Sequence, residues 1–304
     1  MSENTVSELG PFMEAELTSQ PQVWTTAIAQ AKSESLLPAD GLRVAVIGCG
    51  TSWFMAQSYA AARETAGKGV TDAFAASEAF LGAQRGYDAV VAITRSGTTT
   101  EVLEILTALK GTVHTVALVG DLSSSIRTLA DAVVELPYAD EKSVVQTRFA
   151  TTALAYLLTS VGMDLLGAVE EAKDAVSAPV EQELIDAEQF TFLGTGWTVG
   201  LANEAGLKMR EAVQGWTESY PAKEYRHGPI SIAAPNRVTW MFGDQPEGLD
   251  KDVAKTGALY INTTMHPLAE LARVHRVTLE RARARGMNPD LPRNLTRSVI
   301  LTDS

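Results

Sequence analysis

The chain has 304 residues, of which 45% are hydrophobic and 20% are charged, and its formal net charge is −12. This length allows one large α/β domain or two domains of about 150 residues each. Affinity for nucleic acid or an anionic membrane depends on Lys and Arg, so the negative charge argues against both partners. An anionic small molecule would have to be held by local dipoles and a few well-placed side chains.

The remaining composition favours a soluble cytoplasmic protein. Cys49 is the sole cysteine, so no intrachain disulfide can form, which suits a reducing cytosol. The N-terminus has acidic residues where a signal peptide has basic ones, and no run of about 18 apolar residues could span a bilayer. The four histidines are scattered and show no zinc-binding spacing. We therefore expect neither a metal nor an organic cofactor.

Short β-branched runs alternate with helical segments along the first half of the chain. This alternation indicates βαβ units and a parallel sheet. Residues 8–36 are predicted to be helical. The predicted strands are Leu42–Gly48, Tyr87–Ile93, Val113–Val119 and Ala132–Leu136. The predicted helices are Trp53–Glu64, Glu101–Lys110, Ser123–Leu129 and Val144–Leu166.

The same pattern starts again after an acidic connector, Glu170–Gln189. Its predicted strands are Phe190–Gly194, Val238–Gly243, Ala258–Asn262 and Ser298–Thr302, and its helices are Val199–Gln214 and Pro267–Arg285. The similar turns VAVIGCGTSWFMA and FTFLGTGWTVGLA suggest a duplicated α/β unit. We predict an N-terminal helical segment (1–38) and two tandem doubly wound parallel-sheet subdomains (39–168 and 188–304) of the flavodoxin-like, three-layer αβα class.

The first candidate anion site is the glycine-rich turn Gly48–Trp53, in particular Gly50, Thr51 and Ser52. A turn of this kind presents backbone N–H groups and the positive end of a helix to an anion. It is not a dinucleotide fingerprint, because Trp53 occupies the position of the third glycine, and no Lys follows as in a P-loop. Simple punctuation between a strand and a helix explains the turn equally well.

The second candidate anion site is the segment Thr94–Glu101, which has five hydroxyl side chains directly after a buried strand. Capping of the following helix needs only one of them. The surplus hydroxyls, among them Thr94, Ser96 and Thr99, are suited to the oxygens of a phosphate. The sequence therefore favours phosphate binding here over capping alone.

A third group of residues is suited to proton transfer. Lys208 and Glu211 are three residues apart on a predicted helix and so share one face. An isolated pair of this kind would be a solvent-exposed ion pair. His227, however, lies between Arg226 and a Gly-Pro turn, and histidine titrates near neutral pH. We interpret the three residues as candidate catalytic groups.

These segments together resemble the sugar isomerase (SIS) domain family, and particularly the isomerase half of glucosamine-fructose-6-phosphate aminotransferase. The resemblance covers nearly the whole chain. It rests on six segments in the family's order: Met13–Leu17 with Gln20-Pro21, Cys49–Ser52, Thr94–Thr99, Gly206–Glu211, Arg226–Pro229 and Pro292–Val299.

The resemblance implies a role for each matching residue. Phosphate contacts are expected from Ser52, Thr94, Ser96 and Thr99, within loops that also include Gly50, Thr51 and Arg95. Glu211 would move a proton between C1 and C2 of an open-chain sugar, and Lys208 would steady the enediolate. His227 would assist ring opening. A neighbouring subunit can donate this histidine in the family, which implies a homodimer.

The sequence also departs from the aminotransferase. No glutamine-hydrolysing domain precedes the matching region, so glucosamine synthesis from glutamine is not expected. Arg297, a candidate tail contact, replaces the lysine that forms a Schiff base, and arginine stays protonated. Arg95 and Thr98 replace a glutamine and a glutamate of the phosphate loop. Glu141–Thr147, which includes the candidate substrate contact Gln146, is more similar to the tagatose/galactosamine-6-phosphate isomerase-deaminase branch.

The resemblance therefore implies an aldose–ketose isomerase or amino-sugar-phosphate deaminase, acting on a hexose 6-phosphate through an enediol or enolamine. A close variant would act on a plain or glycated sugar phosphate. The rival hypothesis is a non-catalytic phosphosugar sensor, because SIS modules also serve in regulators. A pure sensor would have no chemical use for the three candidate catalytic residues together, and the first 40 residues offer no basic helix-turn-helix.

Overall fold

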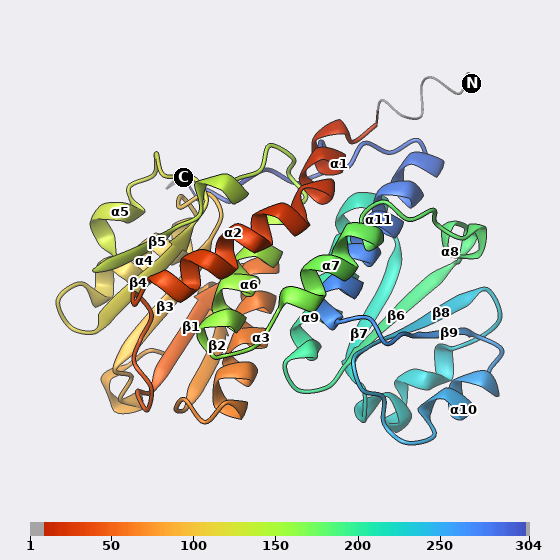
Figure 1. Ribbon diagram of the computed structural model, residues 1–304, viewed down its shortest axis with the longest axis horizontal. Helices are drawn as coiled ribbons and strands as arrows, with labels where there is room; N and C mark the ends of the chain where they lie inside the picture. The colour runs from red at the N-terminus through yellow and green to blue at the C-terminus, as the bar shows by residue number, and fades with distance from the viewer. Residues whose placement is uncertain (1–8, 302–304) are drawn as a thin grey trace. The chain divides into compact units, whose positions relative to one another are not determined.

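The computed structural model describes residues 9–301 of the protein. These residues form two compact units, each with its own parallel sheet (Figure 1). The first-sheet unit comprises Gln22–Glu141, Arg148–Leu165 and residues 296–301. The second-sheet unit comprises residues 9–21, Lys142–Thr147 and Leu166–Leu295. The predicted α/β class with parallel sheets is confirmed.

All strands of the first sheet are parallel and lie in the order β2-β1-β3-β4-β5. Their bounds are β1 Val44–Gly48, β2 Thr71–Ala75, β3 Ala89–Thr94, β4 His114–Val119 and β5 Ala132–Glu135. The chain moves outward from β1 to β2 and then back past β1 to β3, so the direction of winding reverses between β1 and β3. Open α/β sheets bind their ligands at the carboxyl ends of the strands at this switch point.

Helices cover this sheet on both faces, since every residue of β1 and β3 is buried. The helices are α2 Gln20–Ser33, α3 Thr51–Thr65, α4 Thr100–Leu109, α5 Ile126–Leu129 and α6 Arg148–Ser160. Helix α3 packs on β1 and β2 and beside α6. From α4 and α5, Val102, Leu106 and Ile126 pack against alternate strand residues such as Ile47 and Val90. Each such buried aliphatic side chain stabilises the fold by roughly 1.5–3 kcal/mol.

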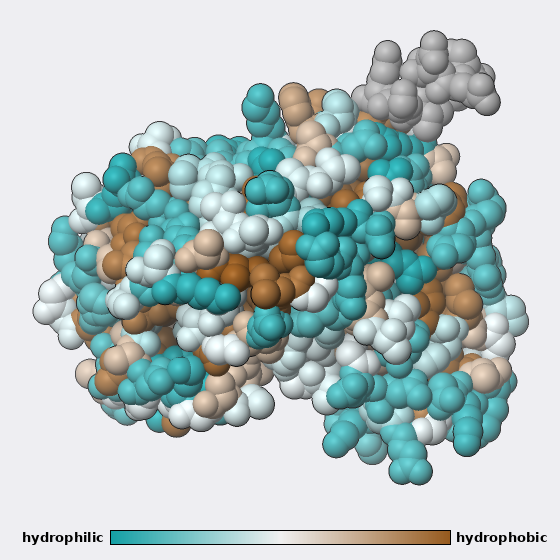
Figure 2. All heavy atoms as spheres, viewed as in Figure 1, coloured by the Kyte–Doolittle hydropathy of each residue, from teal (hydrophilic) through white to brown (hydrophobic). Residues whose placement is uncertain are grey.

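The second sheet is also parallel, in the order β7-β6-β8-β9. Its strands are β6 Gln189–Gly194, β7 Trp216–Pro221, β8 Arg237–Phe242 and β9 Leu259–Asn262. The helices of this unit are α1 Pro11–Thr18, α7 Leu166–Ala175, α8 Gln182–Asp186, α9 Thr198–Val213, α10 Leu249–Ala254 and α11 Pro267–Ala284. Helix α9 packs on β6 and β7, and α11 packs against α9 and α7. Figure 2 shows hydrophilic side chains over α10, at the lower right of the view.

Short 3-10 helices connect several of these elements. They are η2 Ala76–Glu78, η3 Ala83–Arg85, η4 Pro137–Ala139, η5 Glu224–His227 and η6 Pro229–Ile232.

Three predicted helical regions differ from the structure. Residues 9–36 of the predicted N-terminal helix form two helices, α1 and α2, and residue 8 lies outside the described residues. The helix predicted from Val144 begins at Arg148, because the Glu141 carboxylate accepts the backbone N–H groups of Arg148 at 2.7 Å and Phe149 at 3.1 Å. It ends at Ser160 and not at Leu166, where the separate helix α7 begins. The predicted connector, Glu170–Gln189, contains the second half of α7 and all of α8.

The strand predictions failed at one edge of each sheet. The edge strands β2 and β7 were missed, since their sequences, TDAFA and WTESYP, are only partly buried and mix polar with apolar residues. The strand predicted at Ser298–Thr302 is wrong for the described residues 298–301. This segment instead makes single hydrogen bonds, such as Leu301 N–H to Thr100 Oγ1 at 2.9 Å. Residue 302 lies outside the described residues.

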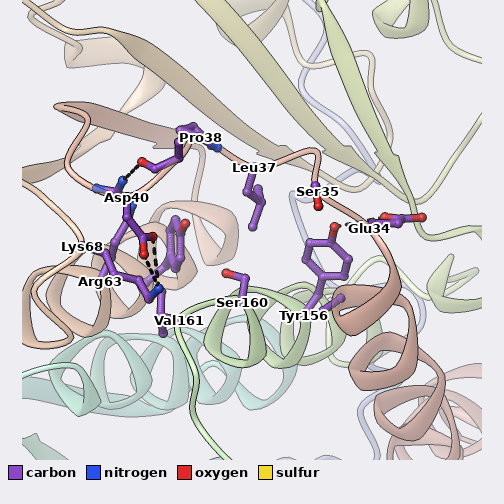
Figure 3. Close-up of a pocket in the computed structure, with 13 residues that line it drawn as sticks. Glu34, Ser35, Leu37, Pro38, Asp40, Arg63, Lys68, Tyr156, Ser160 and Val161 are labelled. Carbon is purple, nitrogen blue, oxygen red and sulfur yellow. Dashed lines mark hydrogen bonds and ion pairs between the residues drawn. The ribbon is translucent and has the colours of Figure 1, made fainter.

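Arg63 ties together the segments that lead into β1 and β2. The side chain is 1% exposed and donates to the carbonyls of Ala39, Leu42 and Gly69 and to Thr71 Oγ1 at distances of 2.8–3.3 Å. It lines a hollow of about 210 Å³ near the ends of α2, α3 and α6 (Figure 3).

The charged groups around this hollow are paired within the protein. Lys68 is 2.8 Å from Asp40, and Glu34 accepts a hydrogen bond from the Tyr156 hydroxyl at 3.0 Å (Figure 3). The lining therefore contributes to folding, because its charged groups are already ion-paired or hydrogen-bonded within the protein.

Replacing Arg63 with Met should lower the free energy of unfolding by about 3 kcal/mol, because several buried acceptors lose a charged donor. Urea denaturation of the full chain measures this change. The control is Arg127→Met, which removes an ion pair to Glu135 whose side chains are 51% and 39% exposed. That variant should lose about 0.5 kcal/mol at most. Equal losses in both variants would contradict the role assigned to Arg63.

Candidate active site

The first candidate phosphate loop lies at the switch point of the first sheet. It connects β1 to α3, and the helix begins at Thr51. The side chains of Thr51 and Ser52 are 4% and 3% exposed, so both are held in the fold at the start of the helix. The N–H groups of Ser52 and Trp53 are already bonded to loop carbonyls, those of Cys49 at 3.1 Å and Gly50 at 3.0 Å. The N-terminal turn of α3 therefore offers mainly its positive dipole at this edge of the sheet.

The second loop connects β3, the neighbouring strand, to α4. Thr94 and Ser96 are each 4% exposed, and their hydroxyls accept N–H groups of the same loop: Gly97 N to Thr94 Oγ1 at 3.2 Å and Thr98 N to Ser96 Oγ at 3.2 Å. Gly97 has φ +62°, and a Cβ there would lie 2.0 Å from Ser124 Oγ. The loop is thus held in a tight conformation that only glycine permits.

Thr99 has the geometry of a residue available to a ligand. It is the N-cap of α4, but its side chain makes no capping hydrogen bond to that helix. A threonine at this position usually accepts an N–H from the first turn. The Thr99 hydroxyl is therefore not used to cap the helix that follows it.

Residues 297–301, called the tail below, lie against this second loop. Ser298 Oγ is 3.1 Å from Ser96 Oγ and 3.0 Å from Thr98 Oγ1. The Thr100 N–H donates to the Val299 carbonyl at 3.4 Å. A serine hydroxyl from the tail thus shares the polar groups of the loop.

Arg297 fastens this tail to the first-sheet unit. Its guanidinium donates to Asp121 at 3.1 Å, to Asp140 at 2.5 Å and to the Glu141 carbonyl at 3.2 Å. Burial lowers the pKa of Arg297, but the two carboxylates outweigh it and the pKa is raised. Arg95 is 2% exposed and donates to the Arg297 carbonyl at 2.5 Å. Both arginines therefore hold the tail in place.

Lys208 and Glu211 are brought together on α9, in the second-sheet unit. Lys208 is completely buried, and its Nζ lies 2.5 Å from Glu211 Oε2. The Glu211 side chain is 21% exposed. It lines a hollow of about 440 Å³ together with Leu207, Arg210, Gln214, Gly215, Arg293, Asn294 and Leu295. One partner is thus locked inside the protein, and the other can reach a ligand.

Two further ionisable groups lie behind Lys208 and were missed in the sequence. Glu204 and His275 are both completely buried; Glu204 Oε1 lies 3.9 Å from Lys208 Nζ, and His275 Nε2 lies 3.2 Å from both Glu204 oxygens. The i,i+4 spacing of Glu204 and Lys208 could have indicated the first contact. No sequence pattern connects His275, on α11, to α9.

His227 is exposed on η5 and makes no hydrogen bond to Lys208 or Glu211. The turn that carries it is anchored by Arg226, which donates to Asp252 at 2.8 Å and to the Glu247 carbonyl at 2.7 Å. The ring of His227 has no partner among the described residues. The anchored turn thus presents a histidine for an external contact.

Gln146 lies in a segment of the second-sheet unit that Glu16 anchors. The Glu16 carboxylate accepts the Lys142 N–H and the Ser143 hydroxyl, each at 2.5 Å. The side-chain oxygen of Gln146 is buried and has no hydrogen-bond partner among the described residues. A buried acceptor without a donor is uncommon, and a ligand hydroxyl would satisfy it.

Over residues 9–301, no three His, Cys, Asp or Glu side chains gather closely enough to hold a metal ion. In the same part of the chain, no helix has the length and apolar character needed to cross a membrane.

Residues 36–161 match the family described as the SIS domain. This part of the chain is a SIS domain. The matched residues include both candidate phosphate loops, whereas α9 and η5 lie beyond them. The family match thus covers the two candidate phosphate loops and does not cover the candidate catalytic residues on α9 and η5.

Curated relatives extend the similarity beyond the SIS domain. The glutamine–fructose-6-phosphate aminotransferase (isomerizing) of Sulfurisphaera tokodaii is 27% identical over 295 residues, covering 85% of this chain and 50% of the relative. That of Xanthomonas campestris is 26% identical over 368 residues, covering 97% and 60%. The chain therefore spans about half the length of the curated relatives it matches, and it is homologous to their isomerase domain.

Solved structures share the fold. Glucosamine-6-phosphate deaminase from Thermotoga maritima has a TM-score of 0.78 at 21% identity, covering 95% of this chain and 99% of that one. Tagatose-6-phosphate ketose/aldose isomerase from Escherichia coli has a TM-score of 0.78 at 16% identity, covering 97% of both chains.

Replacing Arg297 with Met should loosen the tail of the first-sheet unit, because the ion pairs to Asp121 and Asp140 are lost. Amide hydrogen exchange of residues 298–301 should become at least about tenfold faster, the result of losing roughly 1.4 kcal/mol of local stability. Arg293→Met is the control, since Arg293 is an exposed arginine of the neighbouring segment and belongs to the other unit. Unchanged exchange in Arg297→Met would show that the hydroxyl and backbone contacts hold the tail by themselves.

Proposed function

We propose that the protein is a phosphosugar aldose–ketose isomerase that acts on hexose 6-phosphates, with deamination of an amino-sugar phosphate as its preferred reaction. The observation that carries this proposal is the pair formed by the fully buried Lys208 and the partly exposed Glu211. Burying an ammonium group is costly unless it is paired. A protein that only bound the sugar would have no use for a lysine placed in this way.

The pair has the functions that an enediol mechanism requires. Glu211 as a carboxylate removes the proton from C2 of the open-chain aldose and returns it to C1, while the hydroxyl proton on O2 passes to O1, so no net proton is gained or lost. Negative charge develops on the sugar oxygen during this transfer. The Lys208 ammonium is completely buried, so it stabilises that charge through its electric field and not by contact with the sugar, and its bond to Glu211 keeps the carboxylate oriented.

A 2-amino sugar would take the same route to a different end. Proton removal at C2 gives an enolamine, and protonation at C1 gives an imine at C2. Water adds to the imine carbon and ammonia leaves, so the products are a ketose phosphate and ammonia. Arg297 supports this direction over glutamine-dependent synthesis, because an arginine held by two carboxylates cannot form an imine with the ketose.

In this proposal the two loops of the SIS domain hold the 6-phosphate. The starts of α3 and α4 supply positive dipole ends, and Ser52, Ser96 and Thr99 supply hydroxyls. These are local sources of attraction, as a chain with a net charge of −12 requires. The buried Gln146 oxygen would accept a sugar hydroxyl.

His227 completes the proposal as the group that assists ring opening. Its exposure, without a partner in its own unit, supports contact with the sugar or donation to a second copy of the chain. A homodimer is therefore part of the proposal.

The variant Glu211→Gln should lose turnover by at least about 100-fold, because the amide cannot accept the C2 proton, while binding of a hexose 6-phosphate stays within about threefold. Ketose and ammonia are measured separately with the 6-phosphates of glucosamine, galactosamine, fructose, tagatose and fructosyl-amino acids. Glu183→Gln, an exposed glutamate on α8, is the control. An absence of wild-type turnover on the whole panel, with binding retained, would leave the sensor hypothesis in its place.

Thr99→Val tests the phosphate loop with little change in shape. Loss of one hydrogen bond to a charged group should raise KM for the sugar phosphate by about 10- to 100-fold. The free energy of unfolding should stay within about 0.5 kcal/mol of the wild type, since the hydroxyl caps no N–H of α4. Ser125→Ala, at an exposed position before α5, is the control. A KM within twofold of the wild type would exclude Thr99 from phosphate binding.

A further inference from the structure

A chain of buried polar groups leads away from the candidate catalytic pair into the second-sheet unit. It runs from Lys208 through Glu204 on the same helix to His275 on α11 and ends at Gln20. All four residues have 0% exposure. Groups of this kind are expensive to bury, so their arrangement calls for an explanation.

The hydrogen bonds around His275 favour one tautomer of the ring. Gln20 Nε2 lies 3.3 Å from His275 Nδ1, and an amide nitrogen can only donate. With Nε2 of Gln20 as the donor, His275 Nδ1 is the acceptor, and the ring proton lies on Nε2. That proton points to Glu204, whose two oxygens both lie 3.2 Å away.

Glu204 and Glu211 compete for the same ammonium group. Lys208 Nζ lies 2.5 Å from Glu211 but 3.9 Å from Glu204. Glu204 is the more deeply buried of the two carboxylates, so by burial alone it should attract the lysine more strongly. The N–H of His275 satisfies part of the charge on Glu204 and leaves Lys208 closer to Glu211.

We propose that His275 is a positioning residue that keeps Lys208 against Glu211 by hydrogen bonding to Glu204. This inference rests on the proposed function, because the pair that it positions is the proposed proton-transfer pair. Gln20 has a part in the same arrangement, since it selects the tautomer in which Nε2 carries the proton. Without the donor on His275, Lys208 Nζ would shift toward Glu204 and the Glu211 carboxylate would lose its orientation.

The test compares two substitutions at His275 in the full chain. His275→Leu removes the donor, and His275→Gln keeps an N–H donor on a side chain of similar length. His275→Leu should lower kcat by about 10- to 100-fold with KM within about twofold, and His275→Gln should restore kcat to within about threefold of the wild type.

A matched control separates positioning from simple stability. His266, on the same α11, accepts the Leu268 N–H at 3.1 Å as the N-cap and makes no contact with Lys208. His266→Leu should lower the free energy of unfolding by about 1 kcal/mol and leave kcat within about twofold. Equal kcat losses in His275→Leu and His266→Leu, or no rescue by His275→Gln, would overturn the inference.

A second measurement does not depend on turnover. In the full chain labelled with ¹⁵N-histidine, the His275 signals are identified by their absence from His275→Gln. Nδ1 should be unprotonated and Nε2 protonated, and Lys208→Met should shift both signals through Glu204. The opposite tautomer would overturn the inference, and so would signals that Lys208→Met leaves unchanged. Both outcomes can be read even if the wild type shows no turnover and the proposed function fails.

Discussion

The positions of α3 and α9 depend on the same kind of close approach, in which the first turn of the helix touches the glycine that ends the preceding strand. A Cβ on Gly48 would lie 2.6 Å from the backbone carbon of Ser52, and a Cβ on Gly194 would lie 2.3 Å from the Thr198 carbonyl oxygen. No other residue could occupy these positions without moving the helix. The start of α3, with Thr51 and Ser52, and the whole of α9 follow from these two contacts.

In the proposed function, these contacts would let an acidic chain hold an anion. The dipole at the start of a helix acts over a few ångströms, where the overall charge matters little. The buried ammonium of Lys208 is likewise a local charge whose effect reaches only its near neighbours. It is enclosed by two carboxylates, and its influence is confined to what Glu211 can reach.

The interior of both sheets could be predicted from the sequence, because continuous apolar runs such as Ala89–Thr94 are fully buried on two faces. Two edge strands, β2 and β7, could not, since half-exposed residues such as those of Trp216–Pro221 carry no distinctive pattern. Local motifs placed the two loops and the Lys208–Glu211 pair on the right elements. The contact of Gln20 with His275 joins residues 255 positions apart, and no local pattern encodes it.

The two ion pairs of Arg297, with Asp121 and Asp140, also limit how this scaffold can change during evolution. A lysine at that position would lie between Asp121 and Asp140, and two carboxylates at such distances hold an ammonium group in its protonated form. A protonated amine cannot attack a carbonyl carbon. Replacing Arg297 with Lys alone would therefore supply the amine that the resemblance associates with imine formation, but in a protonated, unreactive form. Both aspartates would have to be replaced as well. Because the same ion pairs hold the tail in place, a change to imine chemistry at this position would require several mutations at once.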